Sequence, residues 1–562
     1  MIPSKSAITK MQGIIALIVI IIAVIGGAYY YYASLPVAPP PPPPPPPATT
    51  TTAATATTLE VEEPTKVFVS AETYDFVTDI DPAYSFSGEI IAMANVYETL
   101  LVYTGGTPEV KPALATSYDV SPDGLTWTFK LREGVKFHDG TPFDATAVKY
   151  SFDRIRDLGA GAVYIWDPVE ELKIIDTYTV QYTLSYAVPL QRIVASVYGS
   201  WIYSPKTAEI KDLHDWFNAG HDAGTGPYTI ENLERGVQLT LNWFKDYWGG
   251  WKGPHGKDRI AKVIFRIVED PAVRVQMIEA GTVDHAEAIP SEERKRLETL
   301  PDIHVTWEPM FFTHYAFMNT QSKYLSNKLV RQALAYAFPY DDYIATGEGS
   351  YTQPVGAIPQ GMWGHIPDLY QYKHDLQKAK ELLKEAGYPN GGFKLTYYYI
   401  SGVLATGSAG ELWKAELDKL GIELDVRSMT WPSLWELIKQ GPKAKPGYDI
   451  CAWAWWPTFI TPYDFLYSMW HTEQKPLWNA NFYSNPEYDR LIDDAYKLEG
   501  PNPDEALKLY RQAQEILIED CPTVFLDDLR SPFVLRSNVK GFEYNPAYGY
   551  DTFIFWEMWI ED

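Results

Sequence analysis

The sequence is poor in cysteine and in positive charge. Only Cys451 and Cys521 occur among 562 residues, so the fold is neither a disulfide-rich scaffold nor a cysteine-based zinc module. The two thiols could pair outside the cell, but cysteine is also a commonly buried residue, and the sequence leaves both possibilities open. Lys and Arg total 47 against 72 acidic residues, which gives a net charge of -25. Because nonspecific binding to nucleic acid needs clustered cations, this balance excludes that class of function.

Catalytic and cofactor-binding motifs are also lacking. The sequence has no Gly-x-Ser-x-Gly, no Gly-x-x-x-x-Gly-Lys-Ser/Thr phosphate loop and no His-Glu-x-x-His helix, and its ten histidines are scattered. Acidic pairs such as Asp341-Asp342, Asp493-Asp494 and Asp527-Asp528 are adjacent residues, which face apart on a strand and serve as caps or solvated charges in turns. We therefore expect no catalysis, no cofactor and no zinc or copper. Calcium ligation stays open, because isolated oxygen ligands leave no readable pattern.

One long apolar segment stands near the N-terminus. Residues 13–33 read GIIALIVIIIAVIGGAYYYYA, an uncharged run long enough to cross a bilayer as a helix. Lys5 and Lys10 precede it, so the positive-inside bias places residues 1–12 in the cytoplasm and the rest of the chain outside. We expect a transmembrane anchor; a cleaved signal peptide and a pilin-like signal cut near Gln12-Gly13 are the alternatives. No cysteine lies nearby, which excludes a lipid-modified cysteine anchor.

A linker follows over residues 34–65. Residues 39–47 are nine consecutive prolines, and a Thr/Ala tract extends to residue 58. The proline run predicts a stiff polyproline II rod of about 28 Å. The tract after it has too few large apolar residues to bury a core, so we expect a stalk.

Strand and helix patterns interleave from residue 66 to the end of the chain. Residues 126–131, 179–184 and 262–267 alternate or run apolar as strands do. Helical periodicity covers six segments, namely 145–156, 329–337, 376–386, 410–420, 431–439 and 503–519. This order predicts an α/β fold, and no internal repeat points to a solenoid or propeller.

The stretch from Asp123 to Arg154, DGLTWTFKLREGVKFHDGTPFDATAVKYSFDR, closely resembles the signature of family 5 extracellular solute-binding proteins. That family holds the dipeptide-, oligopeptide- and nickel-binding proteins of ABC-type importers. The resemblance continues in order over roughly 67–555. Its further landmarks are Asp81-Pro82, Val96-Tyr-Glu-Thr-Leu100, Gly224-Thr-Gly-Pro-Tyr228, Lys245-Asp-Tyr-Trp248, 278–284, 330–338, 358–361, 379–387 and 510–522.

The resemblance implies a periplasmic-binding-protein-like fold with two α/β lobes that close over a ligand by a hinge. Lobe I would comprise residues 66–312 and 526–562, and lobe II residues 313–525. Ligand would bind in the cleft between them. The partners implied are membrane permease subunits with separate ATPase subunits, because this chain has no phosphate loop.

The resemblance also implies a ligand-binding segment at 449–465. In peptide-binding members the corresponding strand pairs with the ligand, and an aspartate just beyond it binds the free amino group. Thr458 stands at that position here, which argues against a free α-amino group as the anchor. Asp464 could substitute only if the loop folds differently; otherwise it is a cap before the next helix.

Aromatic residues dominate this segment and supply the other site candidates. Strand alternation should put Trp453 and Trp455 on one face and Trp456 on the other, where indoles can stack on sugar rings or bulky side chains. The family's first-lobe loop and the crossover between lobes add candidates that fit cleft lining and ordinary packing equally well: Tyr84, Phe86, Ser87, Tyr315 and Asn319.

We therefore expect a single-pass membrane protein whose extracytoplasmic domain captures an oligopeptide or a similarly sized oligosaccharide for an ABC importer. The uncleaved anchor, the Thr-rich stalk and the absence of a lipid-modified cysteine look archaeal. The alternatives are a membrane-anchored glycoside-acting enzyme and a structural surface-layer or adhesive protein.

Overall fold

The computed structural model describes residues 63–105, 107–251, 255–441, 447–472, 478–549 and 551–562. The chain divides into two units, Met1–Glu60 and Val61–Asp562, and the described residues belong to the second. The predicted cytoplasmic tip, membrane anchor and nearly all of the linker lie outside them. Among the described residues, no helix combines the length and apolar character needed to cross a membrane.

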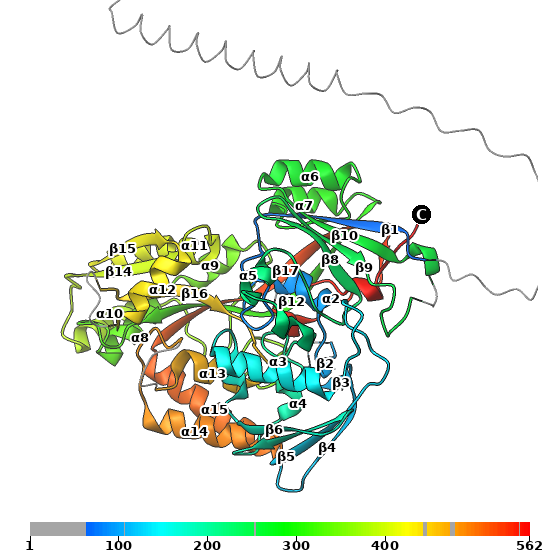
Figure 1. Ribbon diagram of the computed structural model, residues 1–562. Coiled ribbons are helices and arrows are strands. Elements are labelled where there is room, and N and C mark those ends of the chain that lie inside the picture. Colours follow the sequence, from blue (N-terminus) through cyan, green and yellow to red (C-terminus); the bar gives the residue numbers. More distant parts are fainter. Residues whose placement is uncertain (1–62, 106, 252–254, 442–446, 473–477, 550) are drawn as a thin grey trace, which may run out of the picture. The chain divides into compact units, whose positions relative to one another are not determined.

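An 11-stranded mixed sheet forms the frame of this unit (Figure 1). Its strand order is β15-β14-β16-β12-β17-β11-β1-β10-β9-β8, and β13 pairs with β17 off this path. The strands are β1 (Lys66–Glu72), β8 (Tyr228–Glu234), β9 (Gln238–Trp243), β10 (Ile260–Ile267), β11 (His285–Ala286), β12 (Ile303–Met318), β13 (Tyr351–Thr352), β14 (Phe393–Ile400), β15 (Ile422–Met429), β16 (Ile450–Trp455) and β17 (Thr523–Arg536).

Two long antiparallel strands, β12 and β17, run through both halves of this sheet. Up to Pro309, β12 pairs with the end of β17 that also contacts β11. From Thr313 onward it pairs with the start of β17 and with β16. The register is interrupted between Pro309 and Thr313 and shifts again between His314 and Tyr315, so the two halves are joined by continuous strands that are irregular where the halves meet.

A second, antiparallel sheet has the order β4-β5-β7-β6. Its strands are β4 (Ala115–Val120), β5 (Thr126–Leu131), β6 (Val169–Asp176) and β7 (Thr179–Leu184). Helix α3 (Ala145–Leu158) packs on it through Val148, Phe152 and Ile155. The Asp144 side chain caps the start of the helix by accepting from the Thr146 N–H, and Gly159 ends it in the left-handed conformation. Short pairs are β2 (Leu101–Tyr103) with β3 (Val110–Pro112) and β18 (Val539–Lys540) with β19 (Trp559–Ile560).

Several of the remaining helices cover the large sheet, and α13, α14 and α15 pack against one another near the second sheet (Figure 1). A buried core lies between the β14–β16 half and helices α8 to α11, and a smaller core lies under α6 and α7 beside β1. The helices are α2 (Ile90–Val96), α4 (Leu190–Ile193), α5 (Leu213–Asn218), α6 (Pro271–Glu279), α7 (Ser291–Leu297), α8 (Lys328–Ala337), α9 (Tyr340–Thr346), α10 (Leu376–Glu385), α11 (Leu404–Asp418), α12 (Trp431–Lys439), α13 (Pro462–Trp470), α14 (Pro486–Leu498) and α15 (Pro503–Asp520).

The predicted α/β class is confirmed. The strands at 126–131 and 179–184 and the helix at 431–439 have the bounds that the sequence predicted. The helix predicted at 410–420 is wrong at its start, since α11 begins at Leu404. Cys451 and Cys521 are buried free thiols, so the disulfide left open by the sequence does not form in this structure.

Candidate functional site

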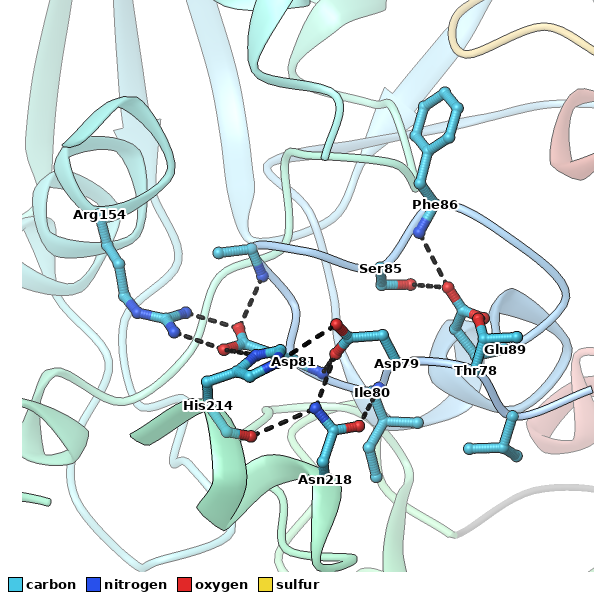
Figure 2. A network of polar contacts seen from close by, with 12 residues as sticks. Thr78, Asp79, Ile80, Asp81, Ser85, Phe86, Glu89, Arg154, His214 and Asn218 are labelled. Carbon is cyan, nitrogen blue, oxygen red and sulfur yellow. Dashed lines mark hydrogen bonds and ion pairs between the residues drawn. The ribbon is translucent and has the colours of Figure 1, made fainter. Parts of the chain in front are cut away.

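The loop before α2 presents Phe86, and two buried carboxylates fix that loop (Figure 2). Asp81 accepts from the Arg154 guanidinium, with Nη1 at 2.6 Å. Glu89 accepts from the backbone N–H groups of Phe86 at 2.8 Å and Ser87 at 2.9 Å. The ring of Phe86 points away from Glu89, so charge-assisted hydrogen bonds hold the backbone while the ring is left to make other contacts.

A cluster of aromatic rings joins this loop to β16. The Phe86 ring lies 6.1 Å from Trp478 at an interplanar angle of 12° and 6.5 Å from Trp455. Trp478 lies 4.6 Å from Trp435 and 5.4 Å from Trp455. The members of this aromatic cluster are Phe86, Trp431, Trp435, Trp453, Trp455 and Trp478.

Two indole N–H groups in the cluster carry no hydrogen bond. Nε1 of Trp453 and Nε1 of Trp478 are buried and have no acceptor among the residues that the structure describes. Leaving a donor unpaired in a buried setting costs about 1–3 kcal/mol. An acceptor supplied by a ligand would remove that cost.

A polar corner closes one end of the cluster. The Tyr164 hydroxyl lies 2.5 Å from Thr458 Oγ1 and donates to Asp464 Oδ1 at 3.1 Å. Asp464 Oδ2 accepts from Trp455 Nε1 at 3.1 Å and from the Thr458 N–H at 2.9 Å. The Ser196 hydroxyl donates to the Thr458 carbonyl at 2.6 Å. Burial raises the pKa of Asp464 to about 7, and these donors oppose that rise.

A small cavity of about 70 Å³ adjoins Asp464. Residues from distant segments share its wall, including Asp167 on one side and Phe459 on the other. Tyr463 and Tyr496 stack there with ring centroids 4.0 Å apart. Five tyrosines line it: Tyr164, Tyr186, Tyr463, Tyr467 and Tyr496.

Six of the ten residues singled out in the sequence meet at this site. They are Phe86, Trp453, Trp455, Trp456, Thr458 and Asp464. Trp456 lies just beyond the end of β16, and its ring stacks on Phe312 with centroids 5.6 Å apart. The direction of its side chain therefore does not follow from the strand alternation used in the sequence analysis.

The other four candidates make contacts within the fold. Ser87 contributes its backbone N–H to Glu89, and the Tyr84 ring lies 4.4 Å from His214. Tyr315 is fully buried and donates to the Ala357 carbonyl at 2.8 Å. Asn319 donates to the Tyr448 carbonyl at 3.1 Å. Their roles in ligand binding stay predictions.

The site also contains residues that sequence reasoning missed, among them Trp478, Tyr164, Ser196 and Phe312. Tyr164, Ser196 and Phe312 come from segments far along the chain from 449–465, Trp478 follows that segment more closely, and none belongs to a motif. Only the fold brings them together.

Three of the landmark motifs noted in the sequence, at 96–100, 224–228 and 245–248, meet elsewhere, at Glu98. Its carboxylate accepts from Thr225 Oγ1 at 2.7 Å, from the Tyr247 hydroxyl at 3.1 Å and from Trp248 Nε1 at 2.8 Å. A Cβ on Gly224 would lie 1.9 Å from the Val96 carbonyl oxygen, so only glycine permits this approach. These motifs build the fold.

A mixed sheet whose halves are joined by two strands, with an aromatic and polar site made from distant segments, is typical of receptors of the periplasmic-binding-protein class. The family model for bacterial extracellular solute-binding proteins, family 5 Middle, matches residues 109–476, and the chain belongs to this family.

Three relatives illustrate the similarity. The probable D,D-dipeptide-binding periplasmic protein DdpA of Escherichia coli (strain K12) is 30% identical over 448 residues, which cover 78% of this chain and 83% of DdpA. The glutathione-binding protein GsiB of Escherichia coli O1:K1 / APEC is 29% identical, covering 79% of this chain and 85% of GsiB. The periplasmic binding protein DppA from Helicobacter pylori, in complex with peptide STSA, has a TM-score of 0.76 and 30% identity, covering 89% of this chain and 99% of DppA.

The family resemblance expected from the sequence is confirmed. This protein is a solute-binding component of an ABC importer; it acts outside the cytoplasm and is not an enzyme. The absence of catalytic motifs agrees with that assignment.

Proposed function

We propose that this protein captures a peptide-type solute between the two predicted lobes and delivers it to a membrane permease. The observation that carries the proposal is the contact of both predicted lobes with the short segment from Trp455 to Asp464. Phe86, Tyr164 and Ser196 reach it from the first lobe. The names of the relatives support a peptide-type ligand, since they refer to dipeptides, to glutathione and to a bound peptide.

Closure by a hinge is part of this proposal. The register interruption in β12, between Pro309 and Thr313, lies beside the predicted lobe boundary at 312/313. Two strands that cross between halves at an irregular point can bend without losing the rest of their pairing. A ligand that contacts both lobes stabilises the closed form by its greater affinity for that form.

The chemistry of the site favours a ligand with bulky side chains and carbonyl groups. The aromatic cluster offers rigid apolar area with few torsions to order. The indole N–H groups of Trp453 and Trp478 would donate to peptide carbonyls. Asp464 already accepts three hydrogen bonds and is 1% exposed, so it is a poor anchor for an ammonium group. None of the relatives named above supports an oligosaccharide ligand, and sugar binding is the alternative outcome of the test below.

Titration calorimetry on the full-length protein in detergent tests the proposal. A mixture of short peptides should bind saturably, and cello-, malto- and xylo-oligosaccharides should not. Acetylating the peptide amino terminus should leave the affinity within about threefold. Binding of the sugars without binding of the peptides would overturn the proposal.

The predicted membrane anchor remains part of the proposal. Its support is the apolar run at 13–33 followed by the proline-rich linker. Residue 13 should be retained in the mature protein, and the protein should stay with membranes after a carbonate wash. A mature N-terminus beyond residue 33 would contradict anchoring by this segment.

A further inference from the structure

A second cavity, of about 390 Å³, lies apart from the aromatic cluster. All its lining residues fall within 66–312 and 526–562, and none belongs to the aromatic cluster. Its walls come from α2, the β2–β3 hairpin and the C-terminal segment 543–557. A cavity of this volume is within the range of sites for small molecules, which run from about 300 to 1,000 Å³.

The walls are largely aromatic. Tyr97 lies 6.1 Å from Trp201, and Tyr247 lies 5.5 Å from both Trp248 and Trp556. The polar atoms of three of these rings already make hydrogen bonds. Tyr247 and Trp248 donate to Glu98, and Trp556 Nε1 donates to the Gly250 carbonyl at 3.0 Å. The rings are thereby held in place, and their wider faces are what the wall can offer a ligand.

Two rings in this wall already receive a cation, and in one of them the guanidinium carbon of Arg259 lies 5.4 Å from the centroid of Trp556. The guanidinium carbon of Arg132 lies 4.0 Å from the centroid of Trp248. Arg132 does not line the cavity and is anchored by the Ala113 carbonyl at 2.9 Å. The indole therefore already makes the type of contact that aromatic cages make with cationic ligands.

Acidic residues outnumber basic ones in the lining of the cavity. Glu98 lies in the wall, and Glu543 and Glu557 are exposed at the lining surface. The lining holds one basic residue, Lys111, whose Nζ is 3.9 Å from Glu557.

Arg132 and Arg259 lie outside the lining and stack on Trp248 and Trp556. Burial raises the pKa of Glu98 to about 7. The preference for a cation therefore rests on the aromatic wall and on the carboxylates at its edge, and not on an excess of charge around the cavity.

A metal ion fits this cavity poorly. Among the described residues, no three His, Cys, Asp or Glu side chains gather closely enough to hold one. Glu98 already accepts from Thr225, Tyr247 and Trp248, whereas a hard cation needs about six oxygen ligands.

We propose that this cavity binds a small organic cation of the alkylated ammonium class, with its apolar substituents against Tyr247, Trp248 and Trp556 and its charge facing Glu98 and Glu557. This site is independent of the peptide site, because the two share no lining residue.

Calorimetry with a matched pair of probes tests the proposal on the full-length protein. Choline is the cationic probe, and 3,3-dimethylbutan-1-ol has the same shape without the charge. We expect saturable one-to-one binding of choline and at least tenfold weaker binding of the alcohol. Equal binding of the two, or no saturable binding of choline, would overturn the proposal.

Variants locate the site. Trp556→Leu and the exposed Glu557→Gln should each weaken choline binding at least threefold. Trp216→Leu, which removes an indole outside both sites, should not change it. Glu557→Gln lies at the surface, so its fold should be intact by circular dichroism. If Glu557→Gln and Trp556→Leu both fold and bind choline as the unmodified protein does, the assignment to this cavity is wrong.

Discussion

Asp464 is the buried acid whose ionisation bears most directly on the site. Its pKa is raised to about 7 by burial, from an ordinary value of 3.8. The folded protein therefore holds this proton more tightly than the unfolded chain does. The contribution of Asp464 to the free energy of unfolding falls as pH rises from about 4 to about 7 and is constant above that.

Asp464→Asn removes this titration. Between pH 5 and pH 8, the free energy of unfolding should fall less in the variant than in the unmodified protein, by up to about 3 kcal/mol. Urea unfolding at the two pH values measures the difference. Other acids with raised pKa values, such as Asp528, are present in both proteins and cancel. An identical fall in the two proteins would show that Asp464 ionises freely in the folded state.

Gly224 tests the role of the landmark motifs at the same scale. A Cβ there would lie 1.9 Å from the Val96 carbonyl oxygen, and backbone cannot move aside cheaply. Gly224→Ala should lower the free energy of unfolding by about 3 kcal/mol or more, seen as a clear drop in the melting temperature. Gly500→Ala is the matched control, since nothing lies within 4 Å of its Cβ position. Equal melting temperatures for the two variants would contradict the packing described around Glu98.

At the scale of elements, sequence patterns locate helices and strands whose signal is local. The strands β5 and β7 alternate clearly, and α12 carries its apolar residues at helical spacing, so their bounds follow from the sequence. The sequence patterns do not reveal helix α14, although Asn485 followed by Pro486 is a typical helix start. The Asn485 side chain accepts a hydrogen bond from the Glu487 N–H, and proline suits the first position of a helix. The long pairing of β12 with β17 joins segments about 200 residues apart, which no local pattern encodes.

The residues of the candidate site also fall into those that a local sequence segment predicts and those that only the fold brings in. The family resemblance points to the segment holding Trp453, Trp455 and Asp464, because it lies within one continuous motif. Trp478 and Tyr164 approach it only through the fold, and the single tryptophan or tyrosine carries no signal of its own.

Helix α12 supplies an indole whose role can be measured. Trp435 lies 4.6 Å from Trp478 and is partly exposed, so its removal should cost ligand contact more than stability. Trp435→Leu should weaken peptide binding roughly tenfold, about 1.4 kcal/mol. Trp307→Leu, in an indole that packs against Arg294 away from the aromatic cluster, should leave the affinity unchanged. If the two variants bound peptide equally well, the aromatic cluster would have a structural role and no role in ligand binding.

An ion pair between α4 and the end of α14 links the predicted lobes. Arg192 Nη1 lies 2.6 Å from Glu499 Oε2, and both residues are buried. Arg192→Met would leave Glu499 buried with Thr461 and Tyr510 as donors but without its cation. Peptide affinity should fall at least tenfold, because closure must then bury an unpaired carboxylate.

The double variant Arg192→Met/Glu499→Leu is the control for that pair. It removes the uncompensated charge and should recover part of the lost affinity, as apolar replacements of buried ion pairs do. A double variant that binds as weakly as Arg192→Met alone would place the loss outside this ion pair. Calorimetry with the same peptide compares all three proteins.

At the scale of the whole folded unit, the proposed capture by closure requires two lobes that move as bodies. The acidic surface, with a net charge of -25, favours solubility but does not select the ligand. In the proposed mechanism, selection comes from closure, since a solute that contacts only one lobe cannot bias the equilibrium between open and closed forms.

The most direct test is the distance between the lobes, measured by electron–electron double resonance. Spin labels on Gln276→Cys in α6 and Lys384→Cys in α10 would report it, because both positions are exposed and the native Cys451 and Cys521 are buried. We predict that a bound peptide shifts the distance distribution to one narrow closed population. A distribution that is unchanged by a saturating, demonstrably bound peptide would contradict capture by closure.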